Sequence, residues 1–246
     1  MTSPLLRIDA VHMSYWRGVR EERVLRGVSL DVREGQFVSV YGQRGSGKTT
    51  LLRVAAGFET PTSGTVAFAG KNLAEISRNE SARLRREEIA WVERSGPESP
   101  ELPMLVYLAL PLYRKLGPAQ AQRRAAAALA KVGAAEAADA RWSSLTDATR
   151  ILVSIAAALV REPRLLLVDD PTGGLNLLDR ERVVGLLRSA AEDGGLGILM
   201  AVPDMPAMLH AHEVRSLSRG RLLAPADPPP EGAGTVVEFP RGERSA

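Results

Sequence analysis

The sequence predicts an α/β fold in which a largely parallel sheet carries an antiparallel β ribbon on its N-terminal side and a helical insertion between its two halves. Short, continuous apolar runs at residues 37–41 and 165–168 are typical of strands buried on both faces of a parallel sheet. Residues 5–11 and 23–32 alternate apolar and polar side chains instead, which is the pattern of half-buried antiparallel strands. Between the two apolar runs lies an alanine-rich, helix-compatible stretch of roughly 55 residues, which predicts the insertion.

The remaining elements are expected from shorter patterns along the chain. Strands are expected where brief apolar runs lie between glycines or helical stretches, at residues 64–70, 89–92, 197–202 and 213–218. Helices are expected at residues 73–88, 151–160, 179–192 and 204–212. We place the helical insertion at about residues 95–160, within a single domain of residues 1–223. Residues 224–246 are rich in proline and glycine and predict a flexible tail.

Residues 42–50 read GQRGSGKTT, which fits the pattern G-x-x-x-x-G-K-[ST] between a predicted strand and a helix-compatible stretch. A glycine-rich turn at the start of a helix presents backbone N–H groups to a phosphate. The Lys48 side chain would then reach the β- and γ-phosphates of a nucleotide, and the Thr49 hydroxyl would hold Mg²⁺. A glycine turn that arose by chance is the alternative, but the strand, the helix, the lysine and the threonine all stand in register. The residues expected to bind the phosphates are Gly42, Gly45, Ser46, Gly47, Lys48, Thr49 and Thr50.

Two aspartates follow the second apolar run. Asp169 ends this predicted strand, and a carboxylate at the C-terminal end of such a strand lies beside the phosphate-binding loop of the sheet. We therefore expect Asp169 to be the second anchor for Mg²⁺, together with Thr49. The alternative is that Asp169 and Asp170 only form a turn after the strand.

Composition limits the other functions of the chain. No apolar run approaches the roughly 20 residues that cross a bilayer, and the N-terminus lacks a basic segment with an apolar signal core, so we expect a cytosolic chain. The absence of cysteine excludes disulfides, thiolate zinc sites and cysteine nucleophiles. The net charge of +3 is carried by arginines spread along the whole sequence, and aromatic residues are few, so no nucleic-acid partner is expected.

Taken together, these segments resemble the ATP-binding subunits of ABC transporters. The resemblance covers about residues 5–223 and rests on VLRGVSLDVREGQFVSVYGQRGSGKTTLL, ALVREPRLLLVDDPTGGLN and the closing RGRL. It implies a P-loop NTPase core of the ABC ATPase type, with ATP and Mg²⁺ as cofactors. Residues 109–112 and 171–173 resemble the lipoprotein-release and macrolide-export branch. Tyr15 falls where the family stacks an aromatic ring on adenine, with a packing tyrosine as the alternative.

In this family two subunits form a head-to-tail dimer, and each ATP lies between the P-loop of one chain and the LSGGQ signature of the other. The signature reads LTDAT here, with Asp147 and Ala148 in place of the two glycines. Asp147 brings negative charge toward the phosphate, and we expect it to cap its own helix and to occupy N–H donors that the phosphate would use. Arg94 stands where a glutamine touches Mg²⁺; a guanidinium has no free lone pair for a cation, but it can pair with the γ-phosphate.

The other departures concern hydrolysis and the dimer seam. Asp170 stands where the family has the glutamate that activates water, and it is one methylene shorter, which leaves a weak candidate for the general base. Asn176 replaces an aspartate of the loop PTGGLN. Pro203 replaces the switch histidine and has neither a side-chain donor nor a backbone N–H. The three histidines, His12, His210 and His212, lie elsewhere and are expected at the surface.

These departures leave three hypotheses. The chain is a transport subunit that binds MgATP with weak or absent hydrolysis; or it is a working transport ATPase with Asp170 as a sufficient base; or it is an ATP-gated scaffold or regulator that transports nothing. The resemblance implies membrane-spanning partner subunits, a second ATP-binding subunit in a homodimer or heterodimer, and a peripheral place on the cytoplasmic face of the membrane. The apolar cluster at residues 100–107 is the expected socket for the membrane subunit, with ordinary helix packing as the alternative.

Overall fold

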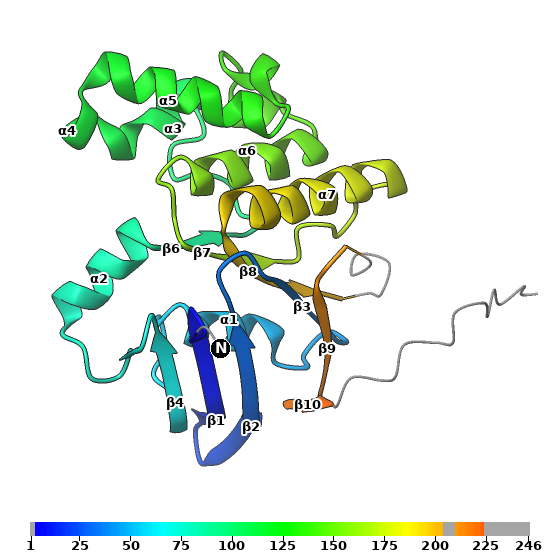
Figure 1. The fold of residues 1–246 in the computed structure, drawn as a ribbon. Coiled ribbons are helices and arrows are strands. Elements are labelled where there is room, and N and C mark those ends of the chain that lie inside the picture. Colours follow the sequence, from blue (N-terminus) through cyan, green and yellow to red (C-terminus); the bar gives the residue numbers. More distant parts are fainter. Residues whose placement is uncertain (1–2, 204–209, 224–246) are drawn as a thin grey trace, which may run out of the picture.

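A computed structural model describes residues 3–203 and 210–223 of the chain. Its strands form two sheets with helix α1 (Lys48–Ala55) between them (Figure 1). The first sheet is antiparallel and has the order β2-β1-β4-β5. Its strands are β1 (Leu6–Arg17), β2 (Arg20–Val32), β4 (Ser63–Phe68) and β5 (Lys71–Asn72).

The second sheet has the order β10-β9-β3-β8-β7-β6, and its neighbours are parallel except for the last hairpin, β9–β10. Its strands are β3 (Phe37–Tyr41), β6 (Ile89–Val92), β7 (Leu165–Asp169), β8 (Gly197–Val202), β9 (Glu213–Ser218) and β10 (Arg221–Leu223). Both β3 and β7 pair with β8, so the loops after β3 and β7 emerge at the same edge of the sheet, one strand apart. This placement brings the two halves of the sequence to one site.

The central strands are buried on both faces, as their continuous apolar runs predict. Along β7, Leu166 and Val168 belong to the core on the helical side of the sheet, whereas Leu165 and Leu167 belong to the core that faces α1. Alternate side chains of a strand point to opposite faces, so each apolar residue has a core to enter. Burial of this kind contributes roughly 1.5–3 kcal/mol for each large side chain.

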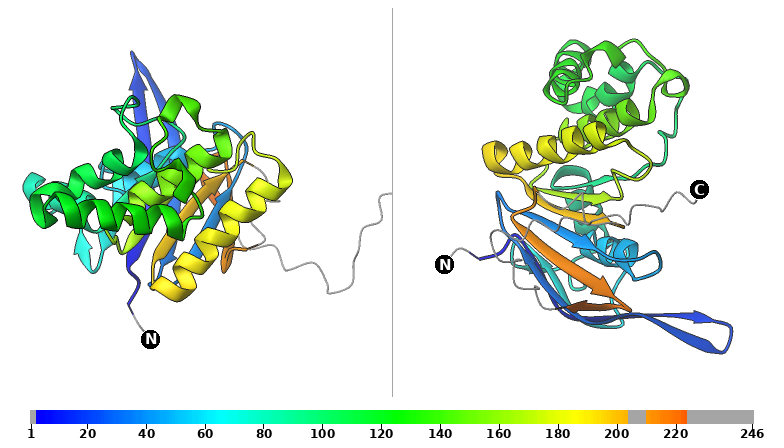
Figure 2. Two further views of the ribbon diagram at one scale, coloured as in Figure 1. Left: turned by 90° about the horizontal axis from the view of Figure 1, so that it is seen from above. Right: turned by 90° about the vertical axis from the view of Figure 1, so that its right-hand side faces the viewer.

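Helices of the insertion stack above α7 (Leu177–Gly194) on one side of the second sheet (Figure 1, Figure 2). The α-helices between β6 and β7 are α3 (Met104–Ala109), α4 (Tyr113–Leu116), α5 (Pro118–Lys131) and α6 (Asp147–Leu159). Short 3₁₀ turns at Leu110–Leu112, Ala135–Ala137 and Trp142–Ser144 join them. In the described part of the chain, no helix has both the length and the apolar character needed to cross a bilayer.

Several boundaries differ from those predicted, each for a local reason. The β1–β2 hairpin extends well beyond residues 11 and 23 and projects from the body (Figure 2), because backbone pairing continues as far as the Arg17–Arg20 pair. Val19, in the turn at its tip, is 99% exposed. Helix α2 (Arg78–Glu87) begins later than predicted, because Ser77 caps it and accepts a bond from the Glu80 N–H. The predicted helix at 204–212 and the tail at 224–246 fall wholly or largely outside the described residues.

Candidate functional site

The loop from β3 to α1 has the backbone that its glycines predict. Gly45 and Gly47 have φ values of 81° and 105°, a left-handed region in which glycine alone is unstrained. A Cβ on Gly42 would lie 2.2 Å from the Leu217 carbonyl oxygen and 2.7 Å from the Ser46 Oγ. Gly42 therefore lets the loop pass close to β9, and a side chain there would push the loop away.

Helix α1 starts with its N–H groups available to a ligand. Its N-cap is Gly47, no side chain caps the helix, and no acidic residue lies in its first turn. The buried Ser46 Oγ has no hydrogen-bond partner among the described residues. Unsatisfied donors at a positive helix end are suited to an anion such as a phosphate.

Lys48 lies folded over this loop. Its Nζ donates to the carbonyl oxygens of Gly42, at 2.6 Å, and Gln43, at 3.0 Å. Burial lowers the pKa of the Lys48 ammonium, while the nearby Asp169 and Asp170 carboxylates raise it. The ammonium is thus held beside the loop, where a phosphate would provide a full negative charge in place of two carbonyl dipoles.

Thr49 and Asp169 meet at the C-terminal edge of the sheet. The Thr49 Oγ1 donates to the Asp169 Oδ2 at 2.7 Å. Burial raises the pKa of the Asp169 carboxyl, the Thr49 bond lowers it, Asp170 and Glu93 raise it, and Lys48 lowers it. A hydroxyl and one carboxylate, with the rest of the coordination left to phosphate and water, fit Mg²⁺. The two residues predicted to hold the metal are therefore brought together.

Asp170 stands next to them in a strained backbone conformation. Its φ is 47°, and its buried Oδ1 has no hydrogen-bond partner among the described residues. A Cβ on Gly173 would lie 2.7 Å from the Asp170 Oδ2 and 2.7 Å from the Arg94 Nη1. The missing side chain of Gly173 thus leaves room for both groups, and Arg94 lies beside Asp170 without forming an ion pair with it.

Tyr15 is held by a partner that the sequence analysis missed. Its hydroxyl donates to the Glu59 Oε2, and the Glu59 Oε1 lies 2.5 Å from the Arg53 Nε. Burial raises the pKa of the Tyr15 phenol, the Glu59 bond raises it further, and a bond with Thr50 lowers it. The phenol therefore lies along α1, next to the P-loop helix. A tyrosine and a glutamate 44 positions apart give no signal in the sequence.

The start of α6 differs from the expectation for Asp147. The N-cap is Thr146, whose Oγ1 accepts a bond of 3.2 Å from the Thr149 N–H, whereas Asp147 lies in the first turn and pairs with Arg150 at 3.2 Å. The prediction that Asp147 caps the helix is therefore wrong, because the residue before it already provides the cap. Its side chain is 64% exposed and keeps its negative charge at the helix start.

We expect Thr146→Ala to lower the free energy of unfolding by about 1 kcal/mol, since one N–H of α6 loses its acceptor. Asp147→Ala, the matched change one residue later, should have a smaller effect because its ion pair is solvent-exposed. Chemical denaturation of both variants measures the difference. A larger loss for Asp147→Ala would contradict this assignment of the cap.

The remaining candidate positions are placed as follows. Asn176 caps α7 through a 2.9 Å bond from the Asp179 N–H, so it performs the capping that an aspartate would. Pro203 follows β8 and lines a hollow with Gly42 and Gln43. His212 is exposed, as expected, and its Nδ1 also accepts a 2.9 Å bond from the Phe37 N–H at the start of β3.

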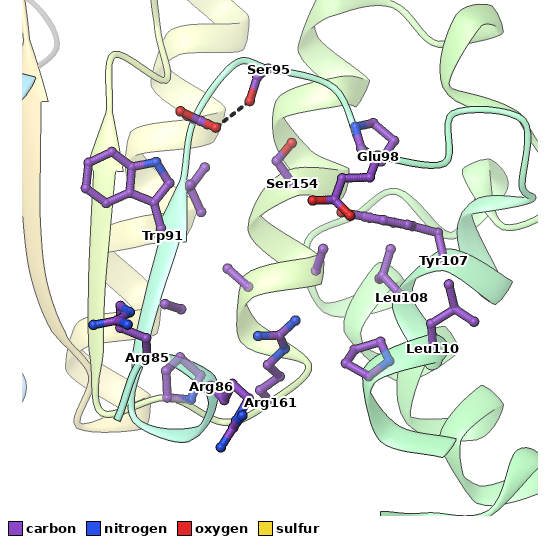
Figure 3. Close-up of a pocket in the computed structure, with 18 of the residues that line it drawn as sticks. Arg85, Arg86, Trp91, Ser95, Glu98, Tyr107, Leu108, Leu110, Ser154 and Arg161 are labelled. Carbon is purple, nitrogen blue, oxygen red and sulfur yellow. Dashed lines mark hydrogen bonds between the residues drawn. The ribbon is translucent and has the colours of Figure 1, made fainter. Parts of the chain in front are cut away.

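A groove lies between β6 and the helical insertion, with a volume of about 690 Å³ (Figure 3). The cluster at residues 100–107, expected to form the socket, contributes little to this groove. Met104 is fully buried in the core, and only Tyr107 of this cluster lines the groove. Trp91 and Leu110 contribute other apolar wall positions.

The chain matches the family model described as "ABC transporter" over residues 25–173. It is 35% identical to the lipoprotein-releasing system ATP-binding protein LolD of Shewanella denitrificans over 201 residues, covering 81% of this chain and 86% of LolD. It is also 35% identical to the macrolide export ATP-binding/permease protein MacB of Azoarcus sp., covering 88% of this chain but only 32% of MacB.

Solved structures agree with this match. The dimeric structure of a bacterial ABC transporter cassette superposes with a TM-score of 0.81 at 26% identity, covering 88% of this chain and 96% of that one. A dimeric post-hydrolysis state of an ATP-binding cassette bound to ADP and Pi gives a TM-score of 0.80 at 26% identity and the same coverage. The predicted fold class is confirmed, and so are ATP and Mg²⁺ as the cofactors of such a cassette. The family match covers the phosphate-binding loop and both Thr49 and Asp169, which the structure brings together. This chain belongs to the ABC transporter family.

Proposed function

We propose that the chain is the ATP-binding subunit of an ABC transport complex, and that it binds MgATP while hydrolysing it weakly or not at all. One observation carries the proposal: the groups suited to phosphate and metal lie together. Lys48 bonds to the P-loop and Thr49 bonds to Asp169, whereas the neighbouring positions for water activation depart from the family pattern. Binding chemistry of this kind needs only the cradle and the cation. The phosphates would contact the loop from Gly42 to Thr50, with Tyr15 beside α1 and Arg94 on the side of Asp170.

Weak hydrolysis is inferred from Asp170 and Pro203. Asp170 keeps a carboxylate oxygen without a partner, but its side chain is short, and an error near 1 Å in the position of a reacting group can cost on the order of a hundredfold in rate. Pro203 offers no donor to the γ-phosphate or to the attacking water. A working ATPase is the second candidate, and the unpartnered, buried Oδ1 of Asp170 is the observation that favours it.

The names of two similar proteins support the proposed partner subunits. LolD is the ATP-binding protein of a lipoprotein-releasing system, and MacB unites an ATP-binding protein and a permease in one chain. We propose that this chain pairs with a second ATP-binding subunit and with membrane-spanning subunits, which places it on the cytoplasmic face of the membrane. An ATP-gated scaffold without transport is the remaining alternative, and co-purification with a membrane protein separates it from a transport subunit.

Two measurements test the proposal. MgATP should bind at equilibrium, whereas steady-state phosphate release by the purified protein should stay near background. The double variant Asp170→Glu with Pro203→His should raise turnover about tenfold or more, because it restores the longer base and the γ-phosphate donor. Unaltered protein that hydrolyses ATP at several turnovers per second would refute weak hydrolysis and would favour the working ATPase.

A further inference from the structure

Arg94 lies at the same edge of the second sheet as the P-loop. Strand β6 pairs in parallel with β7, so the segment that follows β6 emerges beside Asp169 and Asp170. The guanidinium lies close to the backbone of the next loop: a Cβ on Gly173 would lie 2.7 Å from the Arg94 Nη1, and a Cβ on Gly174 would lie 3.5 Å from its Nη2. The two glycines therefore leave the room that the guanidinium occupies.

The Arg94 guanidinium has neither a hydrogen bond nor an ion pair with any other described residue. Asp170 faces it across the space left by Gly173, since a Cβ there would also lie 2.7 Å from the Asp170 Oδ2, but the two charges do not form an ion pair. Glu93, its neighbour in the sequence, bonds instead to the Ser95 Oγ at 2.5 Å. Arg94 thus keeps its positive charge and all its N–H donors for a ligand.

The other cation at this edge is already engaged. Lys48 donates to two carbonyl oxygens of the P-loop, and burial lowers the pKa of its ammonium whereas Asp169 and Asp170 raise it. The charge of Lys48 therefore offsets the two aspartates before any nucleotide arrives. An isolated exposed arginine is ordinarily just hydrated. Arg94 differs because it stands unpaired at the edge where a triphosphate would add its negative charge.

Mg²⁺ normally reduces the repulsion between a triphosphate and neighbouring carboxylates. A triphosphate without the metal carries more negative charge, so the carboxylates of Asp169 and Asp170 repel it more strongly. A guanidinium at the same edge lowers this repulsion, and its planar set of donors matches phosphate oxygens. The same positive charge also weakens the gain from Mg²⁺, because two cations near one phosphate repel each other.

We infer that Arg94 is a specificity-determining residue that lets this chain hold ATP without Mg²⁺ almost as tightly as it holds MgATP. Thr49 and Asp169 remain the groups suited to the metal, and Arg94 sets how much of the affinity depends on it. The inference rests on the proposed function for the presence of ATP in the pocket. It goes beyond that function because it assigns the metal dependence of binding to one side chain.

Isothermal titration with ATP, once in excess Mg²⁺ and once in excess EDTA, tests the inference on the full-length protein. The ratio of the metal-free dissociation constant to that with Mg²⁺ should be about threefold or less for the unaltered protein. Arg94→Gln should raise this ratio about tenfold, mostly by weakening metal-free binding, because a charge-assisted contact is lost. Arg94→Lys keeps the charge and should keep the ratio close to that of the unaltered protein.

The matched control is Arg221→Gln, which removes the same charge at an exposed position on β10, at the opposite edge of the sheet from β6, and should leave the ratio unchanged. A ratio above about tenfold in the unaltered protein, or an equal ratio in Arg94→Gln, would overturn the inference. So would an Arg94→Lys variant that behaves like Arg94→Gln, because the effect would then not come from charge.

The same titrations separate this inference from the proposed function. If the unaltered protein binds ATP in neither buffer, the proposed function is refuted, and this inference with it. If MgATP binds tightly while the ratio fails as described, the inference alone is refuted.

Discussion

Lys48→Ala is expected to weaken MgATP binding about a hundredfold or more. The ammonium is half-buried and is held over the loop by the Gly42 and Gln43 carbonyls, so its position is set before any phosphate arrives. Its removal takes away a charge-assisted contact and also the bridge that joins the two ends of the loop. A charged hydrogen bond in such a setting contributes about 1.5–3 kcal/mol, and the lost bridge adds to it.

Isothermal titration with MgATP measures this effect. Lys71→Ala is the matched control, because Lys71 pairs with Glu80 on the surface at 3.0 Å, away from the P-loop, and its loss should leave the affinity unchanged. If MgATP bound the Lys48→Ala variant as tightly as it binds the unaltered protein, the assignment of this loop to the phosphates would be wrong.

Gly220→Ala is expected to lower the free energy of unfolding by about 3 kcal/mol. Gly220 forms the turn between β9 and β10 with a φ of 78°, and a Cβ there would lie 2.3 Å from the Val24 carbonyl oxygen. Its N–H donates to the Ser46 carbonyl oxygen at 3.2 Å, and its own carbonyl accepts from the Arg26 N–H at 2.8 Å. Alanine at this position would be strained by the positive φ, and its Cβ would also clash with the Val24 backbone. No side-chain rotation can relieve a clash with backbone atoms.

Gly185→Ala provides the opposite control. Gly185 lies inside α7 and has an ordinary φ, and a Cβ there would have no packing neighbour within 4 Å. Alanine there should raise the free energy of unfolding by up to about 1 kcal/mol through helix propensity. Thermal unfolding of the two variants distinguishes them directly; a neutral Gly220→Ala would show that the turn adapts without cost.

Much of the fold was predictable because the strongest signals are local. The strand over residues 37–41 begins and ends as predicted, since an apolar run between polar neighbours leaves few alternatives. The pairing of Thr49 with Asp169 was predicted across 120 residues, because the motif fixes the loop and the sheet fixes the strand end. Boundaries at caps were less accurate: Thr146 and Asn176 start their helices before the apolar periodicity begins.

The parts that sequence reasoning missed depend on tertiary contacts. Tyr15 and Glu59 are joined only because β1 passes α1, and the His212 ring meets the Phe37 N–H only after β9 aligns with β3. The sequence placed Met104 in the apolar cluster expected to receive a membrane subunit, yet the helices of the insertion bury it completely. An apolar side chain in a helix carries no local mark of which neighbour will cover it.

The turn at Gly220 joins three parts of the molecule that are distant in the sequence: the β2 strand, the P-loop and the last hairpin. We expect any tightening of the loop around an anion to be transmitted from the Ser46 carbonyl to Gly220, and from Gly220 to Arg26 and the projecting hairpin. A fluorophore attached near exposed Val19 should thus report occupancy of the pocket from a distance, without touching the nucleotide.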